Sequence, residues 1–261
     1  MSELSLDVTD GVATMTIRRP GVRNALNGQL IRDFNIALDK LQRPDSRVGA
    51  VVLTGSDSVF CSGVDLHSVD LSTPEAQQRA HCEMRRFMDP LILRLSEFRL
   101  PVLAAVNGAA VGAGMSLALV ADIIVAADTA YFTPSFIKLG FVPDGGVIYH
   151  LSRKIGGGRS LSALLLADRI DAATALDWGL IYAVTPETDV FAQTHELARK
   201  LASGPACAIS KLRSLHAAAF NTSLRQHLQA ETLAQRDSLA TGDCVEGVRA
   251  FFEKRTPSFK S

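Results

Sequence analysis

The stretch Leu103–Ser116, LAAVNGAAVGAGMS, decides the predicted fold, and the rest of the chain is built around it. Its apolar first part, residues 103–106, is typical of a buried strand, and the following Asn-Gly pair predicts a turn. Gly112-Ala113-Gly114 then leads into a segment of good helix-forming residues. The first N–H groups of a helix have no partner inside it, and glycines let another molecule approach them closely. The stretch therefore predicts free donors and the positive end of a helix dipole at one point, which suits an oxygen gaining negative charge.

Three other interpretations compete for this stretch. Residues 100–121 carry no charge and contain a GxxxG pattern, as a membrane span can, but the Asn-Gly pair and the glycines interrupt a continuous helix. Gly112-x-Gly114 after a strand also resembles a dinucleotide fingerprint. Its third glycine position is Leu117, however, and the next acid, Asp128, lies only about 14 residues beyond Gly114 instead of roughly 20. Plain close packing of a helix on a strand stays open as an alternative.

Composition limits the class of protein. The chain has 261 residues, of which 47% are hydrophobic and 21% are charged, so it can bury a substantial core as one large domain or one domain with an appendage. It has 27 basic and 27 acidic residues, which gives no reason to expect nucleic acid or a membrane as partner. No signal peptide, CxxC pair or metal-ligand spacing of histidines is present, so we expect a cytoplasmic chain without a metal.

The first part of the chain predicts a hairpin, a basic loop and a helix. Ser5–Thr9 and Val12–Ile17 alternate on either side of an Asp-Gly pair, which is a strong hairpin signal. Residues 18–26, RRPGVRNAL, carry three arginines that could hold phosphates or stay solvated. Residues 27–42 then have apolar side chains at helical spacing and predict an amphipathic helix.

A second strand followed by a glycine-bearing loop precedes the central stretch. Val48–Thr54 is apolar enough for a buried strand, and the segment FCSGVDL follows at residues 60–66. The two strand-loop units are about 50 residues apart, a weak repeat of the kind found in stacked, solenoid-like cores. If the units stack in register, the Val64 N–H and the Ala113 N–H face one point and form a two-donor oxyanion hole. Cys61 reads as a small buried hydrophobic residue.

The middle of the chain carries one candidate proton carrier. Residues 74–98 predict a helix that Pro90 could kink, and strands are expected at 122–127 and 130–132. The helix has apolar side chains on one face: Met84, Phe87, Met88, Leu91 and Leu95. Asp144 then stands in a Pro-Asp-Gly-Gly segment between apolar residues. Such surroundings would desolvate its carboxyl and make it more basic, although a turn residue or helix cap is the equal alternative.

The remainder is predicted to be mostly helical. Helices are expected at 159–167, 172–178, 189–203, 205–220, 223–240 and 243–255, with a short strand at 180–184. A helical tail after a mixed core indicates a separate layer, plausible as an oligomer contact. We therefore divide the chain into a core at residues 1–200 and a helical region at 201–261.

Taken together, these motifs resemble the crotonase superfamily, also called the enoyl-CoA hydratase/isomerase family. The matches are RRPGVRNAL, VVLTG with FCSGVDL, LAAVNGAAVGAGMSLALVADI, KLGFVPDGG, ALDWGLI and EGVRAFFEKRTPSF, in that order over nearly the whole chain. The resemblance implies an α/β fold, a spiral of ββα units with a C-terminal helical region for oligomerisation. It also implies a homotrimer or a hexamer built as a dimer of trimers, an acyl-CoA thioester as substrate, and no cofactor, since CoA is part of the substrate.

The resemblance also implies roles for particular residues. Val64 and Ala113 match the two positions whose amides form the oxyanion hole. The matching contacts to CoA are Arg23 near the phosphates, Ser62, Asp65 and Leu66 at the adenine side, and Phe251 and Lys254 from the C-terminal region, often of a neighbouring subunit.

Departures from the family pattern decide the expected chemistry. Ser116 and Ser135 stand where the hydratases carry their two water-activating glutamates, and serine has no useful basicity near neutral pH. Losing one positioned acid–base group costs on the order of 10²–10⁴-fold in rate. Asp144 remains, and its segment resembles the isomerase branch, including 1,2-epoxyphenylacetyl-CoA isomerase. We expect Δ3,Δ2-enoyl-CoA isomerisation with Asp144 as the single acid/base; an enoyl-CoA hydratase, an aromatic epoxide-CoA isomerase and a scarcely catalytic acyl-CoA-binding protein are the alternatives.

Overall fold

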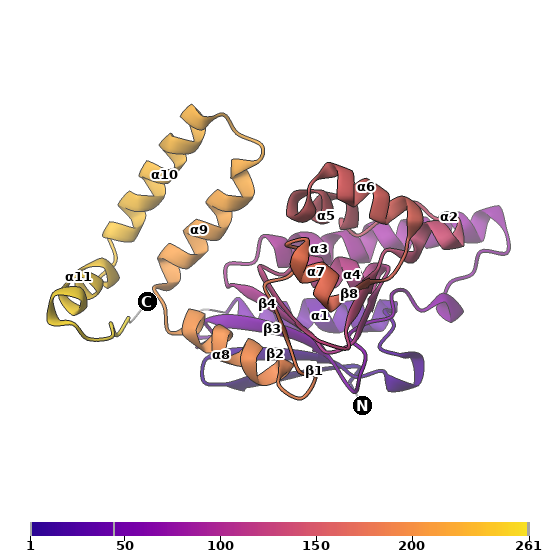
Figure 1. Cartoon of the computed structure of the whole chain (residues 1–261), viewed down its shortest axis with the longest axis horizontal. Helices are drawn as coiled ribbons and strands as arrows, with labels where there is room; N and C mark the ends of the chain where they lie inside the picture. The colour runs from indigo at the N-terminus through magenta and orange to yellow at the C-terminus, as the bar shows by residue number, and fades with distance from the viewer. Residues whose placement is uncertain (1, 44, 260–261) are drawn as a thin grey trace.

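Two sheets organise the computed structural model of the chain, which describes residues 2–43 and 45–259 (Figure 1). The first sheet has the strand order β1-β2-β3-β4-β6-β9 and the second has the order β5-β7-β8. The strands are β1 (Leu4–Thr9), β2 (Val12–Ile17), β3 (Ala50–Gly55), β4 (Val102–Val106), β5 (Ala109–Val111), β6 (Ile123–Ala127), β7 (Tyr131–Thr133), β8 (Ile170–Asp171) and β9 (Ala183–Thr185). Because the chain passes from β4 to β5 and from β6 to β7, it alternates between the sheets, and the predicted spiral α/β fold is confirmed.

The helices lie around these sheets. The α-helices are α1 (Gly28–Leu41), α2 (Pro74–Glu83), α3 (Asp89–Ser96), α4 (Ala113–Leu119), α5 (Val147–Ile155), α6 (Gly157–Leu166), α7 (Ala172–Asp177), α8 (Val190–Ala202), α9 (Ala206–Ala219), α10 (Leu224–Leu239) and α11 (Asp243–Glu253). Short 3-10 turns are η1 (Pro20–Val22), η2 (Leu66–Ser68) and η4 (Ser135–Leu139), and η3 (Met84–Met88) is a π-helix. The helix predicted over 74–98 is thus found as α2, η3 and α3, ending at Ser96, and the interruption expected at Pro90 takes the form of a π-helical turn just before it.

The first hairpin is built as predicted. β1 pairs antiparallel with β2, with Thr9 opposite Val12. Asp10 and Gly11 between them both have positive φ, 52° and 74°, the backbone that matches the twist of a two-residue hairpin. The helix expected at 27–42 is confirmed as α1, whose first turn is capped by the Asn27 side chain accepting from the Leu30 N–H at 2.7 Å.

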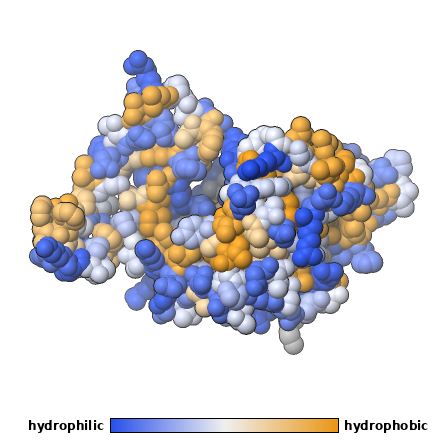
Figure 2. All heavy atoms as spheres, in the orientation of Figure 1, coloured by the Kyte–Doolittle hydropathy of each residue, from blue (hydrophilic) through white to orange (hydrophobic). Residues whose placement is uncertain are grey.

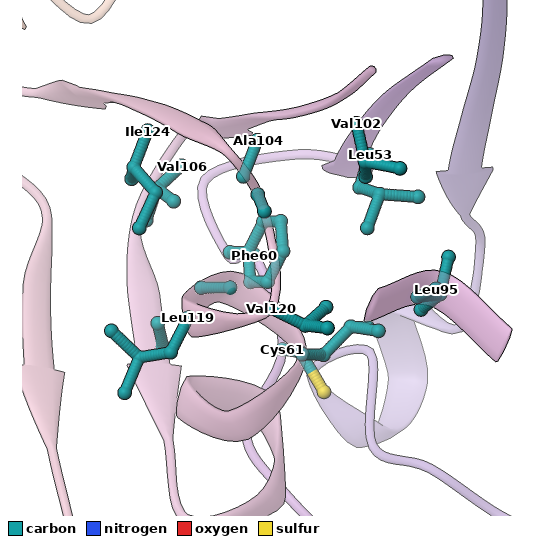
Figure 3. Packing of buried hydrophobic residues seen from close by; sticks show 14 of the residues in the cluster. Leu53, Phe60, Cys61, Leu95, Val102, Ala104, Val106, Leu119, Val120 and Ile124 are labelled. Carbon is teal, nitrogen blue, oxygen red and sulfur yellow. The ribbon is translucent and has the colours of Figure 1, made fainter. Parts of the chain in front are cut away.

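The parallel strands form the centre of the core. β2, β3, β4, β6 and β9 pair in parallel, and every residue of β3 and β4 is buried. Such strands are apolar on both faces because helices cover both sides of the sheet, and α8 packs across β3, β4 and β6. Figure 3 shows Phe60 amid this core, close to Ala104 and Leu119. The Cys61 side chain is fully buried, so the prediction of a small buried hydrophobic residue is confirmed, and burial raises the pKa of its thiol to about 12.

The link between β4 and β5 holds the two sheets together. The Asn107 side chain donates to the Gly55 carbonyl at 2.9 Å and to the Asp57 carbonyl, which ties this turn to the end of β3. A Cβ at Gly108 would lie 2.0 Å from the Ser58 carbonyl oxygen, so only glycine fits there. The turn was predicted, but the three-residue strand β5 after it was not.

The last three helices extend away from the sheets as an arm (Figure 1). α8 still packs on the first sheet, and the chain leaves it between Ser203 and Pro205, after which α9 packs mainly against α10. Arg213 of α9 ties the arm to the core, since its guanidinium pairs with the Asp122 carboxylate at 2.7 Å and donates to the Phe98 carbonyl. Within the described residues, no helix has the length and apolar character needed to cross a membrane.

Candidate active site

A cavity of about 490 Å³ opens where the two strand-loop units meet. The loop after β3 contributes Ser62 and Val64, the start of α4 contributes Ala113, and the loop after η4 contributes Asp144. The remaining wall is mainly apolar and is formed by Leu66, Val69, Leu71, Phe136, Leu139, Phe141 and Val142. The structure therefore brings together the three residues predicted to carry the chemistry in a mostly apolar chamber.

The two predicted oxyanion amides are both available. Ala113 is the first residue of α4, so its N–H has no acceptor inside the helix. Val64 forms a parallel bridge with Leu26 in which the Leu26 N–H donates to the Gly63 carbonyl and the Asp65 N–H donates to the Leu26 carbonyl. The Val64 N–H thus points away from the bridge, and within the described residues neither amide has a hydrogen-bond acceptor.

Three glycines bring these amides side by side. A Cβ at Gly114 would lie 2.2 Å from the Cys61 carbonyl oxygen. A Cβ at Gly63 would lie 2.9 Å from the Val111 carbonyl oxygen and 3.6 Å from the Ala113 nitrogen. Gly112, with φ +53° and ψ −122°, turns the chain from β5 into α4 in a backbone region that other residues rarely adopt. The glycines in this stretch therefore serve close packing and expose the two donors at the same time.

Asp144 lies in the cavity with part of its carboxyl cut off from water. Its Oδ1 is buried and has no hydrogen-bond partner. Gly145 and Gly146 follow with φ of +57° and +76°, so the chain turns sharply after the aspartate and enters α5. Burial raises the pKa of Asp144 from 3.8 to about 6, and the negative charge of Asp89 adds to the rise. A carboxyl of this kind can exchange a proton near neutral pH.

The two serines take different places. Ser116 is fully buried, and its hydroxyl donates to the Asp144 main-chain carbonyl at 3.1 Å. Ser135 lines the cavity near Gly112. Asp144 is the only carboxylate among the described residues that line this cavity.

The residues predicted for CoA contact divide into two groups at this site. Ser62 and Leu66 line the cavity, and Arg23 is exposed next to Ser62, whose N–H donates to the Arg23 carbonyl at 3.2 Å. Asp65 does not line the cavity, because its carboxylate is paired with the Arg19 guanidinium at 3.0 Å. Within the basic loop, Arg19 therefore supports the fold, whereas Arg23 is exposed and its contact with phosphate stays a prediction.

Phe251 and Lys254 are not brought to the cavity of their own chain. α11 lies at the far end of the arm, whereas α2, which lines the cavity, lies at the opposite end of the molecule (Figure 1). Phe251 and Phe252 are 78% and 77% exposed there. Their predicted contact with CoA therefore stays a prediction that requires a second subunit.

The structure adds residues that the sequence analysis missed. Gln77 and His81 of α2 line the cavity. They are four residues apart and so share one face of the helix, and this spacing is the sequence pattern that could have revealed them. Asp89 acts electrostatically on Asp144. The sequence feature that could have revealed Asp89 is an acidic residue inside the apolar segment from Phe87 to Leu91. No group of three or more residues suited to a metal ion occurs in the described part of the chain, and the metal-free site stays a prediction.

Comparison with known proteins identifies the family. The family model described as Enoyl-CoA hydratase/isomerase matches residues 7–261. The chain belongs to the enoyl-CoA hydratase/isomerase family. A protein of Rhodobacter capsulatus named "Probable enoyl-CoA hydratase" is 37% identical over 258 residues, which are 97% of this chain and 96% of that protein. The 1,2-epoxyphenylacetyl-CoA isomerase of Escherichia coli is 34% identical over 252 residues, with 97% and 96% covered.

Solved structures agree with this assignment. An enoyl-CoA hydratase from Bacillus anthracis superposes with a TM-score of 0.92 at 29% identity, and the match covers 99% of both chains. The resemblance to the crotonase superfamily is thereby confirmed, and the chain is an enzyme of a family that acts on acyl-CoA thioesters. The family contains hydratases and isomerases, so the choice between them depends on the residues of this site.

Proposed function

We propose that this enoyl-CoA hydratase/isomerase family member moves a double bond in an acyl-CoA thioester from the 3 to the 2 position, with Asp144 as the single acid/base. The observation that carries the proposal is the Asp144 carboxyl, which lines the same cavity as Val64 and Ala113 and has one buried oxygen without a partner. A carboxyl placed opposite two free amides can remove a proton next to a thioester carbonyl while the amides take up the charge that forms.

The amides would stabilise the enolate. The thioester oxygen accepts hydrogen bonds from the Val64 and Ala113 N–H groups, and the N-terminal end of α4 adds a favourable dipole. Each donor is expected to contribute about 3–4 kcal/mol to the transition state, the range measured for single oxyanion donors. The apolar wall keeps water away and strengthens these interactions.

Asp144 would carry the proton between two carbons. The ionised carboxylate takes one proton from C2, and the C2–H electrons form a dienolate whose charge rests on the thioester oxygen. The charge on the oxygen then re-forms the thioester carbonyl, and a C2=C3 double bond forms. The electrons of the former C3=C4 bond take the same proton from Asp144 at C4. A pKa of about 6 serves both steps, because the group is ionised at neutral pH and yet holds a proton well enough to deliver it.

Hydration is disfavoured by the serines. Adding water across a double bond needs a base for the water and an acid for the carbon. Ser116 is engaged with the Asp144 carbonyl, and Ser135 lacks basicity. Rapid hydration of crotonyl-CoA would contradict the proposal.

The test is the variant Asp144→Asn. We expect it to lose conversion of 3-hexenoyl-CoA to 2-hexenoyl-CoA by on the order of 10²–10⁴-fold, while its affinity for a saturated acyl-CoA stays within about twofold. Solvent exchange of the C2 proton in D₂O should fall equally. Retained turnover in Asp144→Asn would overturn the role of Asp144, and tight binding without any C2 exchange in the wild type would indicate a binding protein.

A second candidate is isomerisation of an aromatic epoxide-CoA, favoured by the relative from Escherichia coli. Both reactions use an oxyanion hole and one proton carrier, so a panel of acyl-CoA substrates distinguishes them. For either reaction we propose that Arg23, Ser62 and Leu66 hold CoA in one subunit, and that Asp65 supports their loop through its ion pair with Arg19. Phe251 and Lys254 would reach the CoA from a neighbour in a homotrimer or hexamer.

A further inference from the structure

We propose that Asp89 is a positioning residue of this active site, a second carboxylate that acts through Asp144 and moves upward the pH range over which Asp144 works as a base. The inference rests on the proposed function for its catalytic consequence, but the electrostatic contact itself can be measured without turnover. Asp89 lies outside the cavity lining, so it acts on the proton carrier and not on the substrate.

The geometry of α3 places Asp89 beside the Asp144 turn. Asp89 is the first residue of α3, directly after the π-helical turn η3. Its neighbours on this helix touch the turn: the Met88 Cε would lie 3.4 Å from a Cβ at Gly145, and the Ile92 Cγ2 would lie 3.6 Å from a Cβ at Gly146. The first turn of α3 therefore packs against the two glycines that follow Asp144.

Among the residues that the structure describes, neither carboxylate has a neutralising partner. Within the described residues Asp89 forms no ion pair or side-chain hydrogen bond, and the Asp144 Oδ1 likewise has no donor. Elsewhere on the same helix the charges are paired, since Arg94 binds Asp39 at 2.6 Å. Asp89 is exposed and has no paired cation among the described residues, so its charge adds to the effect of burial on Asp144, because two nearby carboxylates resist being ionised together.

Other ionisable groups around the turn do not cancel this effect. His150 of α5 packs against Gly146, and burial lowers its pKa to about 4, so it is neutral at pH 7. Next to it, the Lys154 ammonium donates to the Ala121 carbonyl and the Arg153 guanidinium lies over the Tyr149 ring at 3.4 Å; both keep their charge, but neither contributes to the pKa of Asp144.

His81 of α2 is the one remaining titratable side chain in the cavity lining of the described chain. Asp89 is accordingly the group that raises the pKa of Asp144 beyond the effect of burial, which is the larger cause.

The charge of Asp89 also affects how Asp144 holds and delivers the proton. Once Asp144 has taken a proton it is neutral, and the charge of Asp89 favours that neutral form. The proton is then held until the carbon skeleton accepts it. An Asp144 without this neighbour would ionise at lower pH and be a weaker base.

The experiment is a pair of matched variants. Asp89→Asn removes the charge next to the turn, and Glu97→Gln removes the same charge from the exposed C-terminal end of the same helix. The carboxyl carbons of ¹³C-labelled aspartate are titrated by NMR, and the Asp144 signal is assigned by its loss in Asp144→Asn. We expect Asp89→Asn to lower the pKa of Asp144 by about half a unit or more, roughly threefold in proton affinity, and Glu97→Gln to leave it unchanged.

Activity provides the second readout. The acidic limb of the pH profile of kcat/KM should move down by the same amount in Asp89→Asn and return in Asp89→Glu. An unmoved Asp144 titration, or a loss of kcat without any change of the pH profile, would overturn the role of Asp89. A shifted titration in a protein that does not isomerise 3-enoyl-CoA would uphold Asp89 and defeat only the proposed function.

Discussion

At the scale of single residues, the site depends on leaving polar groups without partners. Buried polar atoms are normally hydrogen-bonded, because an unsatisfied one costs free energy. Here the Asp144 Oδ1 and the Val64 and Ala113 amides lack partners in the described part of the chain. These are the atoms that the proposed reaction uses, so the fold gives up some stability to keep them free.

The Asp144 carboxyl should therefore make stability depend on pH. Its pKa is about 6 in the folded chain against 3.8 for the unperturbed group, so the folded state binds the proton more tightly. The free energy of unfolding then falls as pH rises from about 4 to about 6. The full shift corresponds to about 3 kcal/mol, which solvent screening of the half-buried carboxyl reduces, so Asp144→Asn should be more stable than the wild type by roughly 1–2 kcal/mol at pH 8 and equal to it at pH 4. Urea unfolding at pH 4 and at pH 8 checks this. Glu97→Gln is the control, and it should leave the free energy of unfolding unchanged at both pH values.

Single residues also mark the limit of sequence prediction here. Asp144 could be identified because an aspartate between apolar residues stands out in any sequence. The availability of the Val64 and Ala113 amides followed from the glycine pattern. Asp89 could not be placed, because its effect depends on how α3 lies against the Asp144 turn. The ion pair that turns Asp65 toward Arg19 likewise joins residues 46 apart and leaves no local pattern.

At the scale of elements, close contact between α4 and the loop after β3 sets the distance between the two amides. This contact depends on Gly114, because any Cβ there would meet the Cys61 carbonyl oxygen at 2.2 Å. Backbone on both sides leaves no flexible side chain to move aside.

We therefore expect Gly114→Ala to push the two loops apart. The rate of the proposed isomerisation should fall at least tenfold, and the free energy of unfolding should fall by about 1–3 kcal/mol, the usual cost of overpacking. Gly158→Ala in α6 is the matched control, because a Cβ at Gly158 meets nothing within 4 Å and alanine suits a helix better than glycine. Denaturant unfolding and the rate of 3-hexenoyl-CoA conversion test both; an active, stable Gly114→Ala would contradict the argument.

The elements that the sequence predicted are those with a long, regular pattern. The buried strands, the first hairpin, α1 and the four C-terminal helices all follow from periodicity and turn residues. β5 and β8 have three and two residues, too few to show a pattern, and they exist because neighbouring strands supply their hydrogen bonds. α5 was missed because Gly145 and Gly146 before it signalled only a turn, although Gly146 caps the helix.

At the scale of the whole molecule, the arm exposes apolar surface far from the cavity. Figure 2 shows hydrophobic side chains at the free end of the arm, where Phe251 and Phe252 lie. Arg213 holds the arm in place at its base, with its side chain only 12% exposed. A rigidly placed arm with an apolar end is suited to packing on another copy, as the family resemblance implies.

If the arm completes the site of a neighbouring subunit, Lys254 should matter for CoA and not for the acyl group. We expect Lys254→Ala to raise KM for a CoA thioester by about three- to tenfold, since a lysine contacts phosphate as a single positive charge. The KM for the same acyl group on pantetheine, which lacks the nucleotide phosphates, should stay unchanged. Lys200→Ala, which removes an exposed lysine from α8, serves as the control. An equal rise in KM with both substrates would mean that Lys254 acts on the fold of the arm, and no rise with either would exclude it from the CoA site.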